Sequence, residues 1–174
     1  MSTRRVFQSA MVISAMPAMG KSYIASKFPD RIRDLESSEY HWQMTIDGKN
    51  FLTDEDGDKI LNPEWPINYI EAIRNLVESK FYDAILVSAH ENIRHLMSEH
   101  GIKYANVYPE DKKKMRKALI ERCIDRGSSA DFIDNYEENF SKYVDSMKND
   151  KGSVVNVEIP FKELTEWVNW LFQY

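Results

Sequence analysis

The segment from Ser14 to Tyr23, which reads SAMPAMGKSY, limits the possible fold of this chain more than any other segment. It follows a compact apolar run at residues 10–13, which is typical of a strand buried on both faces of a parallel sheet. It overlaps residues 22–28, whose apolar side chains indicate a short helix that stops before Pro29. The sequence therefore predicts a buried strand, a loop of small residues and a helix in direct succession.

The loop contains the tripeptide Gly20-Lys21-Ser22, which matches the second half of the phosphate-binding pattern G-x-x-x-x-G-K-[ST]. In that pattern, backbone N–H groups surround a phosphate, the lysine reaches the β- and γ-phosphates, and the hydroxyl binds Mg²⁺. Ala15 stands where the first glycine is expected, and its side chain is small enough to preserve the turn. The position between a strand and a helix favours a nucleotide-binding loop over a simple turn. The predicted nucleotide-binding residues are Ala15, Pro17, Ala18, Met19, Gly20, Lys21, Ser22 and Tyr23, with Ser22 as the metal ligand.

Length and composition indicate one globular domain over residues 1–174, because a chain of about 150 residues already buries a substantial core. The net charge of −5 argues against a surface devoted to duplex nucleic acid, which is usually basic. Nucleic acid is therefore not an expected partner, although it is not excluded, and a small anionic ligand remains compatible with this charge.

The chain has no apolar run near the roughly 20 residues that cross a bilayer, and we expect no membrane association. A single cysteine, Cys123, cannot form an internal disulfide and suits the reducing cytoplasm. We expect this thiol to be buried and unreactive. A monomer and a homodimer are equally compatible with the sequence.

The rest of the chain alternates between helical and strand patterns, which favours a parallel sheet with crossover helices. Strands are predicted at residues 32–35, 82–88, 102–108 and 154–159, and helices at residues 66–80, 91–100, 111–126, 130–148 and 161–172. Residues 41–65 are polar and rich in turn-forming residues, so they predict an irregular insertion with room for a small hairpin. The acidic cluster at residues 54–58 lacks the spacing of a calcium loop and is interpreted as a solvated turn.

Two carboxylates and two hydroxyls follow the second predicted strand, in the segment Asp34-Leu35-Glu36-Ser37-Ser38. Strand ends usually face the ligand in α/β folds, and residues two apart share a face of an extended strand. If a phosphate accepts the phosphoryl group, it needs positioning rather than a base, whereas a hydroxyl should give its proton to Asp34 or Glu36. Both possibilities remain open. His90 follows the third predicted strand, where contact with substrate and a structural hydrogen bond are equally compatible.

Basic residues cluster between positions 112 and 126, which is enough to build a local positive pocket despite the negative net charge. Arg122 and Arg126 lie four positions apart on one face of a predicted helix, so both guanidinium groups can reach the same phosphates. The alternative interpretation is a solvated charged helix.

Five segments together carry a family resemblance, namely residues 15–22, 34–38, 88–90, 108–109 and 122–127. With these segments, the chain resembles the P-loop nucleotide kinases over nearly its whole length. The most similar members are the small (deoxy)nucleoside monophosphate kinases encoded by tailed bacteriophages. The resemblance implies the three-layer α/β fold of P-loop NTPases, with a five-stranded parallel sheet in the order 2-3-1-4-5. It also implies an acceptor-site insertion at residues 41–65 and a helical lid at residues 110–130, whose arginines neutralise the transferring phosphoryl group.

The chain departs from the common pattern at one metal-binding position. Many P-loop proteins hold Mg²⁺ through an acidic residue at the end of the third strand, where this chain has Ser88. The metal would then depend on Ser22 and water, or on Asp34 and Glu36.

The resemblance implies ATP- and Mg²⁺-dependent phosphoryl transfer to a nucleotide, with a deoxynucleoside monophosphate as the expected acceptor and, for a phage protein, the host cytoplasm as its location. Two alternatives remain open. One is a kinase for a hydroxyl on a nucleoside or on a hydroxymethylated DNA base, and the other is a non-catalytic ATP-binding regulatory module. The expected catalytic residues are Lys21, Asp34, Glu36, Arg122 and Arg126, and the expected substrate-binding residues are Glu36, Ser37, Tyr40, Tyr69 and His90.

Overall fold

The computed structural model describes residues 10–164 and 166–167, and its α/β fold is built on a five-stranded sheet. All neighbouring strands are parallel, and their order is β2-β3-β1-β4-β5. The strands are β1 (Met11–Ala15), β2 (Ile32–Asp34), β3 (Ala84–Val87), β4 (Tyr104–Pro109) and β5 (Val155–Ile159). The register places Ile13 of β1 beside Leu86 of β3 and Ala105 of β4. The predicted α/β class, the parallel five-stranded sheet and its strand order are confirmed.

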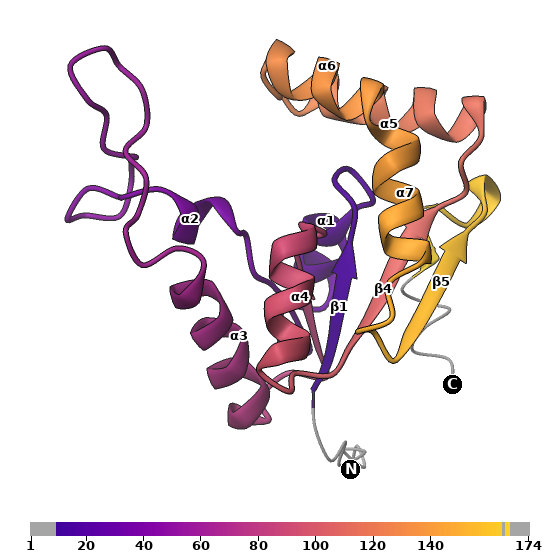
Figure 1. Ribbon diagram of the computed structural model, residues 1–174, viewed down its shortest axis with the longest axis horizontal. Coiled ribbons are helices and arrows are strands. Elements are labelled where there is room, and N and C mark those ends of the chain that lie inside the picture. Colours follow the sequence, from indigo (N-terminus) through magenta and orange to yellow (C-terminus); the bar gives the residue numbers. More distant parts are fainter. Residues whose placement is uncertain (1–9, 165, 168–174) are drawn as a thin grey trace.

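Helices cover both faces of the sheet; Figure 1 shows α4 and α7 in front of it and α1 behind it. The helices are α1 (Lys21–Lys27), α2 (Ser38–His41), α3 (Ile67–Ser79), α4 (Glu91–Glu99), α5 (Lys113–Asp125), α6 (Ala130–Glu138) and α7 (Phe140–Lys148). Because successive side chains of a strand point to opposite faces, neighbouring residues of β1 enter different hydrophobic cores. Val12 belongs to a cluster with Ile73 of α3, whereas Ile13 belongs to a cluster with Ile24 of α1. The sheet is therefore the middle of three layers.

The single helix predicted over residues 130–148 is wrong, because the chain forms two helices that meet at Asn139. The backbone of Asn139 leaves the helical region, with φ −101° and ψ 10°, and its side-chain amide donates to the carbonyl oxygen of Asn135 at 3.0 Å. Asparagine favours such positions because its amide competes for local backbone groups. The break lets α6 lie across the carboxyl ends of the strands while α7 runs along the sheet (Figure 1).

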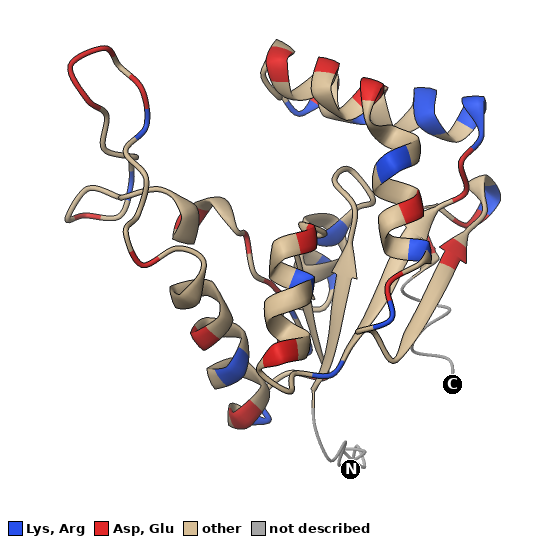
Figure 2. Ribbon diagram, viewed as in Figure 1, with Lys and Arg blue, Asp and Glu red and all other residues tan. Residues whose placement is uncertain are grey.

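The insertion at residues 41–65 is irregular, as predicted, and the short α2 ends at its first residue, His41. Isolated antiparallel bridges join Trp42 to Leu61, Met44 to Phe51, and Thr53 to Lys59, so the predicted hairpin character is confirmed. At its acidic tip, Asp54 Oδ1 accepts hydrogen bonds from the backbone N–H groups of Asp56 and Asp58, as expected for an exposed turn. Figure 2 shows this acidic tip on one side of the molecule and the basic start of α5 on the other.

The closing helix predicted at residues 161–172 falls mostly outside the described residues, and Phe161–Glu163 forms a 3₁₀ turn. In the described part of the chain, no helix has the length and apolar character needed to cross a membrane.

Candidate functional site

The β1–α1 loop, residues 16–20, connects the central strand to the helix behind the sheet. Its conformation requires positive φ angles at Ala18 (61°) and Gly20 (92°). A glycine adopts this left-handed conformation without the steric cost that other residues pay, which explains Gly20. Ala15, in contrast, is the buried last residue of β1 and has no positive φ. The absence of a glycine at that position is therefore compatible with the geometry of the loop.

Each backbone carbonyl from Ala15 to Gly20 accepts a hydrogen bond. The donors are Lys21 Nζ for Ala15 (2.9 Å) and Met16 (3.3 Å), Tyr136 Oη for Pro17 (3.1 Å), Arg122 Nη1 for Ala18 (3.2 Å), Trp167 Nε1 for Met19 (2.8 Å) and Ile24 N for Gly20 (3.0 Å). The N–H groups of residues 18–23, by contrast, have no hydrogen-bond acceptor among residues 10–164 and 166–167. In a planar trans peptide the C=O and N–H groups point in opposite directions. The loop carbonyls are thus occupied within the protein, which leaves a run of N–H donors, the arrangement that binds anions.

Lys21 closes the loop in this structure by donating to the carbonyls at its start. Burial lowers the pKa of its ammonium group below the usual lysine value, and the positive charge of Arg126 acts in the same direction. The carboxylates of Asp34 and Glu36 partly oppose that shift. An anionic ligand at the loop would supply negative charge that opposes this lowering and favours the ammonium form.

Ser22 of α1 and Asp34 at the end of β2 meet beside the loop. Ser22 Oγ donates to Asp34 Oδ2 at 2.6 Å, and Asp34 Oδ1 is buried without a hydrogen-bond partner among the described residues. Burial raises the pKa of the Asp34 carboxyl, although the hydrogen bond from Ser22 and the charge of Lys21 act against the rise. Two hard oxygen ligands fit Mg²⁺, which binds one or two carboxylates and otherwise uses waters and substrate phosphates. No cluster of three or more His, Cys, Asp or Glu side chains suited to a metal occurs in the described part of the chain.

The helical arm, made of α5 and α6, lies above the loop and brings the two predicted arginines to it (Figure 1). Arg122 contacts the Ala18 carbonyl, as described above. Arg126 donates through Nε to Ser128 Oγ at 2.9 Å, and its guanidinium carbon lies 5.6 Å from the centre of the Phe132 ring. Both arginines therefore lie near the loop, but only Arg126 lines the cavity described next.

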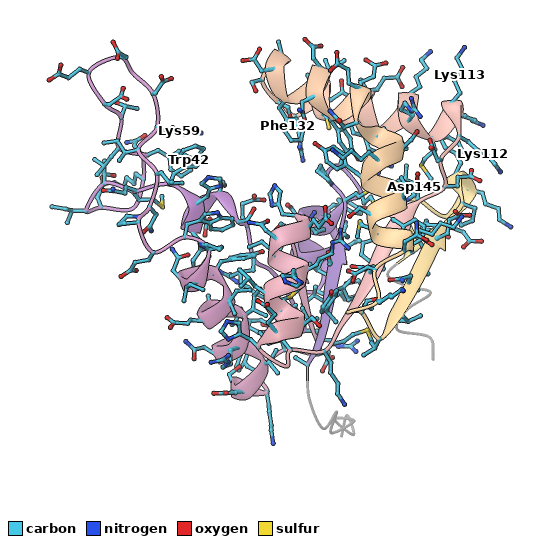
Figure 3. The ribbon with its side chains drawn as sticks, in the orientation of Figure 1. Trp42, Lys59, Lys112, Lys113, Phe132 and Asp145 are labelled. Carbon is cyan, nitrogen blue, oxygen red and sulfur yellow. The ribbon has the colours of Figure 1, made fainter. Side chains whose placement is uncertain are left out.

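A cavity of about 1460 Å³ opens beside the β1–α1 loop and continues between α4 and α7. Of the predicted site residues, it is lined by Ala15, Pro17, Lys21, Glu36, Ser37, His90 and Arg126. Figure 3 shows the side chains around this region, with Trp42 on the insertion side and Phe132 on α6. The structure thus brings together predicted residues from four separate stretches of sequence.

One wall of the cavity is formed by residues 35–37, which follow β2, and residues 88–90, which follow β3; we call it the β2–β3 wall. Glu36 is exposed there, and its carboxylate forms no hydrogen bond or ion pair with the described residues. His90 Nδ1 lies 3.1 Å from Ser88 Oγ. Although part of its ring reaches solvent in the cleft, the surrounding protein atoms lower the pKa of His90, which favours the neutral imidazole.

Tyr40 and Tyr69 do not line the cavity, although both were predicted to bind substrate. Tyr69 is fully buried; its hydroxyl donates to the Leu35 carbonyl at 2.7 Å and accepts from Ser88 N at 3.2 Å. Tyr40 packs on it with ring centres 5.2 Å apart. The Tyr69 hydroxyl thus ties together the two halves of the β2–β3 wall. Tyr23 is also away from the cavity, and its side chain is 61% exposed.

Sequence reasoning missed two side chains that hold the loop. Tyr136 lies among the apolar side chains of α6 and is buried in the core, and its hydroxyl also donates to the Pro17 carbonyl. Burial raises its pKa, so the hydroxyl keeps the proton that it donates. Trp167 likewise buries its ring and donates its N–H to Met19. The available signal was chemical: an aromatic residue with a polar group needs a partner when it is buried.

Sequence reasoning also missed a buried ion pair at the far end of the cavity. Arg94 of α4 is 3% exposed and pairs through Nη1 with Asp150 Oδ2 at 2.5 Å. Tyr104 and Asn106 of β4 donate to the same carboxylate oxygen, which ties α4 and β4 to the segment after α7. Cys123 is buried, as predicted, and burial raises the pKa of its thiol, which fits an unreactive side chain.

Comparisons with known proteins add little to this site. No protein-family model matches the chain, and no curated protein matches it. Among solved structures, the chain is similar to an uncharacterized protein from Eubacterium ventriosum ATCC 27560, with 13% sequence identity and a TM-score of 0.43. The match covers 94% of this chain and 97% of that chain. A similarity at this level carries no argument about function.

Proposed function

We propose that this protein is an ATP- and Mg²⁺-dependent phosphotransferase whose acceptor is a nucleotide or a nucleoside. One observation carries the proposal: the carbonyls of residues 15–20 all accept hydrogen bonds within the protein, while the N–H groups of residues 18–23 have no acceptor in the described part of the chain. A polyphosphate supplies the acceptors that these groups lack. Lys21 stands beside them with a cationic side chain. The β1–α1 loop would then be a P-loop, the fold that of the P-loop NTPases, and the cytoplasm the source of ATP.

Ser22 and Asp34 would hold the metal in this proposal. The unpartnered Asp34 Oδ1 and the adjacent Ser22 hydroxyl replace the acidic residue that is absent at Ser88. When bound, Mg²⁺ would neutralise charge on the β- and γ-phosphate oxygens. Asp34 also orients the Ser22 hydroxyl before any metal binds, because the two side chains are already hydrogen-bonded.

The helical arm supports phosphoryl transfer rather than ATP binding alone. Arginine side chains near a transferring phosphoryl group stabilise the charge that develops in its transition state. Arg126 lines the cavity, and its charge acts on Lys21, so the two cations share one region of the site. A regulatory module that only senses ATP would not need this second cation beside the loop lysine.

The size of the cavity fits two substrates. A site for one small ligand usually measures roughly 300–1,000 Å³, and this cavity reaches about 1460 Å³. The deoxynucleoside monophosphate implied by the family resemblance is one candidate acceptor. A hydroxyl acceptor is a second candidate, favoured by the free carboxylate of Glu36 on the cavity wall.

The proposal is tested with purified protein, Mg²⁺ and ATP labelled in the γ-phosphate, incubated with ribo- and deoxynucleosides, their monophosphates and hydroxymethylated DNA. ATP binding is measured in parallel by calorimetry. We expect ATP·Mg²⁺ binding and transfer of label to an acceptor. Folded protein that binds no ATP would contradict the phosphate-loop assignment, and binding without any transfer would instead favour the regulatory module.

A further inference from the structure

The charges that line the cavity are unevenly distributed. The lysine and arginine side chains on its wall are Lys21, Arg94, Arg126, Lys142 and Lys151. None of them belongs to the β2–β3 wall, whose charged side chain is Glu36. The β2–β3 wall therefore presents one carboxylate and otherwise neutral groups.

The cations of the cavity belong to other walls or are held in ion pairs. Lys21 belongs to the loop side, although its charge interacts with that of Glu36, and Arg126 comes from the helical arm. Arg94 is held in its ion pair with Asp150, while Lys142 and Lys151 lie on α7 and the segment after it. Arg33 acts on Asp34 through space but does not line the cavity. An acceptor phosphate seated against the β2–β3 wall would meet the Glu36 carboxylate without a cation from that wall, which disfavours a dianionic acceptor.

Glu36 and Asp34 differ in how their oxygens are used. Asp34 is partly buried and bonded to Ser22, which suits a metal ligand. Glu36 is exposed to the cavity, and its carboxylate is free of hydrogen bonds and ion pairs within the described residues. A free carboxylate beside a phosphoryl donor can accept the proton of an attacking hydroxyl.

The remaining groups of the wall suit a polyhydroxyl acceptor. Ser37 places a hydroxyl next to Glu36, and His90 offers a ring nitrogen beyond the one that contacts Ser88. Such neutral donors and acceptors recognise sugar hydroxyls without requiring charge on the ligand.

We propose, resting on the phosphotransferase function above, that the acceptor is the hydroxyl of a neutral sugar-bearing molecule, such as a nucleoside, and that Glu36 is the general base. The hydroxyl oxygen forms a bond to the γ-phosphorus of ATP, and its proton moves to the Glu36 carboxylate. The bond between the γ-phosphorus and the β–γ bridging oxygen breaks, and ADP leaves with that electron pair. Glu36 then releases the proton to solvent, so the products are a phosphate monoester, ADP and one proton.

The product distinguishes the two acceptor classes. The full chain is incubated with ATP, Mg²⁺ and either nucleosides and hexoses or nucleoside monophosphates, and the products are identified by ³¹P NMR. We expect a new phosphate monoester, with at least about tenfold higher kcat/KM for a hydroxyl acceptor than for any monophosphate. A new P–O–P linkage made from a monophosphate overturns this inference but leaves the phosphotransferase proposal standing. ATP turnover that yields only inorganic phosphate across the panel also overturns it, whereas absence of ATP binding refutes the underlying function instead.

A matched pair of variants tests the role of Glu36. Glu36→Gln removes the carboxylate from the cavity wall, and Glu39→Gln makes the same change on α2, at an exposed residue that does not line the cavity. We expect Glu36→Gln to lower kcat with the hydroxyl acceptor about 100-fold or more, with an unchanged KM for ATP. Glu39→Gln should match the wild type in both readouts. Full activity of Glu36→Gln would overturn the assignment, and so would a gain in monophosphate turnover that exceeds the hydroxyl activity of the wild type.

Discussion

The two sides of the cavity have opposite electrostatic character. On the loop side, backbone N–H groups, Lys21 and Arg126 present positive charge or hydrogen-bond donors. On the β2–β3 wall, Glu36 presents a carboxylate, and His90 is biased toward its neutral form. Two unit charges about 4 Å apart interact by roughly 1 kcal/mol in water and 4 kcal/mol near a protein surface. Interactions of this size are large enough to favour the proposed anionic donor on the loop side and the proposed neutral acceptor on the β2–β3 wall.

The contrast shows how a chain with a net charge of −5 could offer the proposed phosphate site. The loop relies on uncharged backbone N–H groups and on a few cations, while Arg122, Tyr136 and Trp167 hold its carbonyls. Single substitutions on the loop side test this contrast, and we expect their effects to decrease from Lys21 to Tyr136.

Lys21→Ala removes the cation that the loop itself contributes to the loop side. We expect phosphoryl transfer to fall about 10³-fold, because a preorganised charge at the transferring group is lost. The variant also loses the bonds to Ala15 and Met16, so its folding is checked by circular dichroism. Lys27→Ala, an exposed position in the last turn of α1, is the matched control and should behave like the wild type. Equal activities of the two variants would show that Lys21 has no role in phosphoryl transfer.

Arg126→Ala removes the cation that the helical arm contributes to the cavity. We expect kcat to fall about 100-fold, less than a full arginine effect because Arg122 remains near the loop. The Kd for ATP should change little, since the arginine acts mainly on charge that develops during transfer. Steady-state kinetics compared with Lys117→Ala, an exposed position on the same helix, provides the test. A loss confined to ATP affinity would argue against a role in transfer.

Asp34→Asn should change the metal requirement more than the ATP requirement. We expect half-maximal activity to need about 10- to 100-fold more Mg²⁺, because one oxygen ligand becomes weaker while Ser22 and the phosphates remain. Asp30→Asn is an exposed control in the turn after α1. An unchanged Mg²⁺ dependence in Asp34→Asn would exclude this carboxylate as a ligand.

The same carboxyl predicts a pH effect with a definite sign. Its pKa is raised in the folded protein, so protons compete with Mg²⁺ at higher pH than for an ordinary aspartate of pKa about 3.9. The apparent Mg²⁺ affinity should therefore be constant above the raised pKa and fall as the pH drops through it. Magnesium titrations at several pH values should show this fall in the wild type and lose it in Asp34→Asn.

Tyr136→Phe gives the smallest expected effect, because it removes a single hydrogen bond to the loop at Pro17. A neutral hydrogen bond contributes about 1 kcal/mol, which corresponds to a roughly fivefold weaker affinity for ATP. Tyr82→Phe makes the same change at a half-buried position that does not line the cavity and serves as the control. Calorimetric titration with ATP compares the two variants, and equal affinities would show that the Tyr136 hydroxyl does not support the loop.

The fold was predictable because its strands are short apolar runs separated by helical patterns, and the left-handed turn at Gly20 marks one junction. The break at Asn139 was not predictable from periodicity, because the apolar stripe continues from Tyr136 of α6 into Phe140 and Val144 of α7. A stripe shows which side chains are buried, but it does not report a change in the direction of the backbone.

The residue types of the site were predictable, but their pairings were not. The spacing of Gly20-Lys21-Ser22 indicated a phosphate site, and the position of Asp34 after a strand indicated a ligand-facing edge. The hydrogen bond between Ser22 and Asp34 depends on how α1 packs beside β2, which no local pattern encodes. The contacts of Tyr136 and Trp167 with the loop join residues more than one hundred positions apart, so they too required the tertiary structure.

The most direct test of the loop side is a titration of ¹⁵N-labelled protein with ATP·Mg²⁺, followed by amide NMR with AMP as the comparison ligand. The N–H groups of residues 18–23 have no acceptor among residues 10–164 and 166–167, so phosphate oxygens should become their acceptors. We predict downfield shifts of these amides with ATP and much smaller shifts with AMP, which lacks the β- and γ-phosphates. Unchanged amides at residues 18–23, with shifts instead at the far end of the cavity near Gly152, would contradict the assignment.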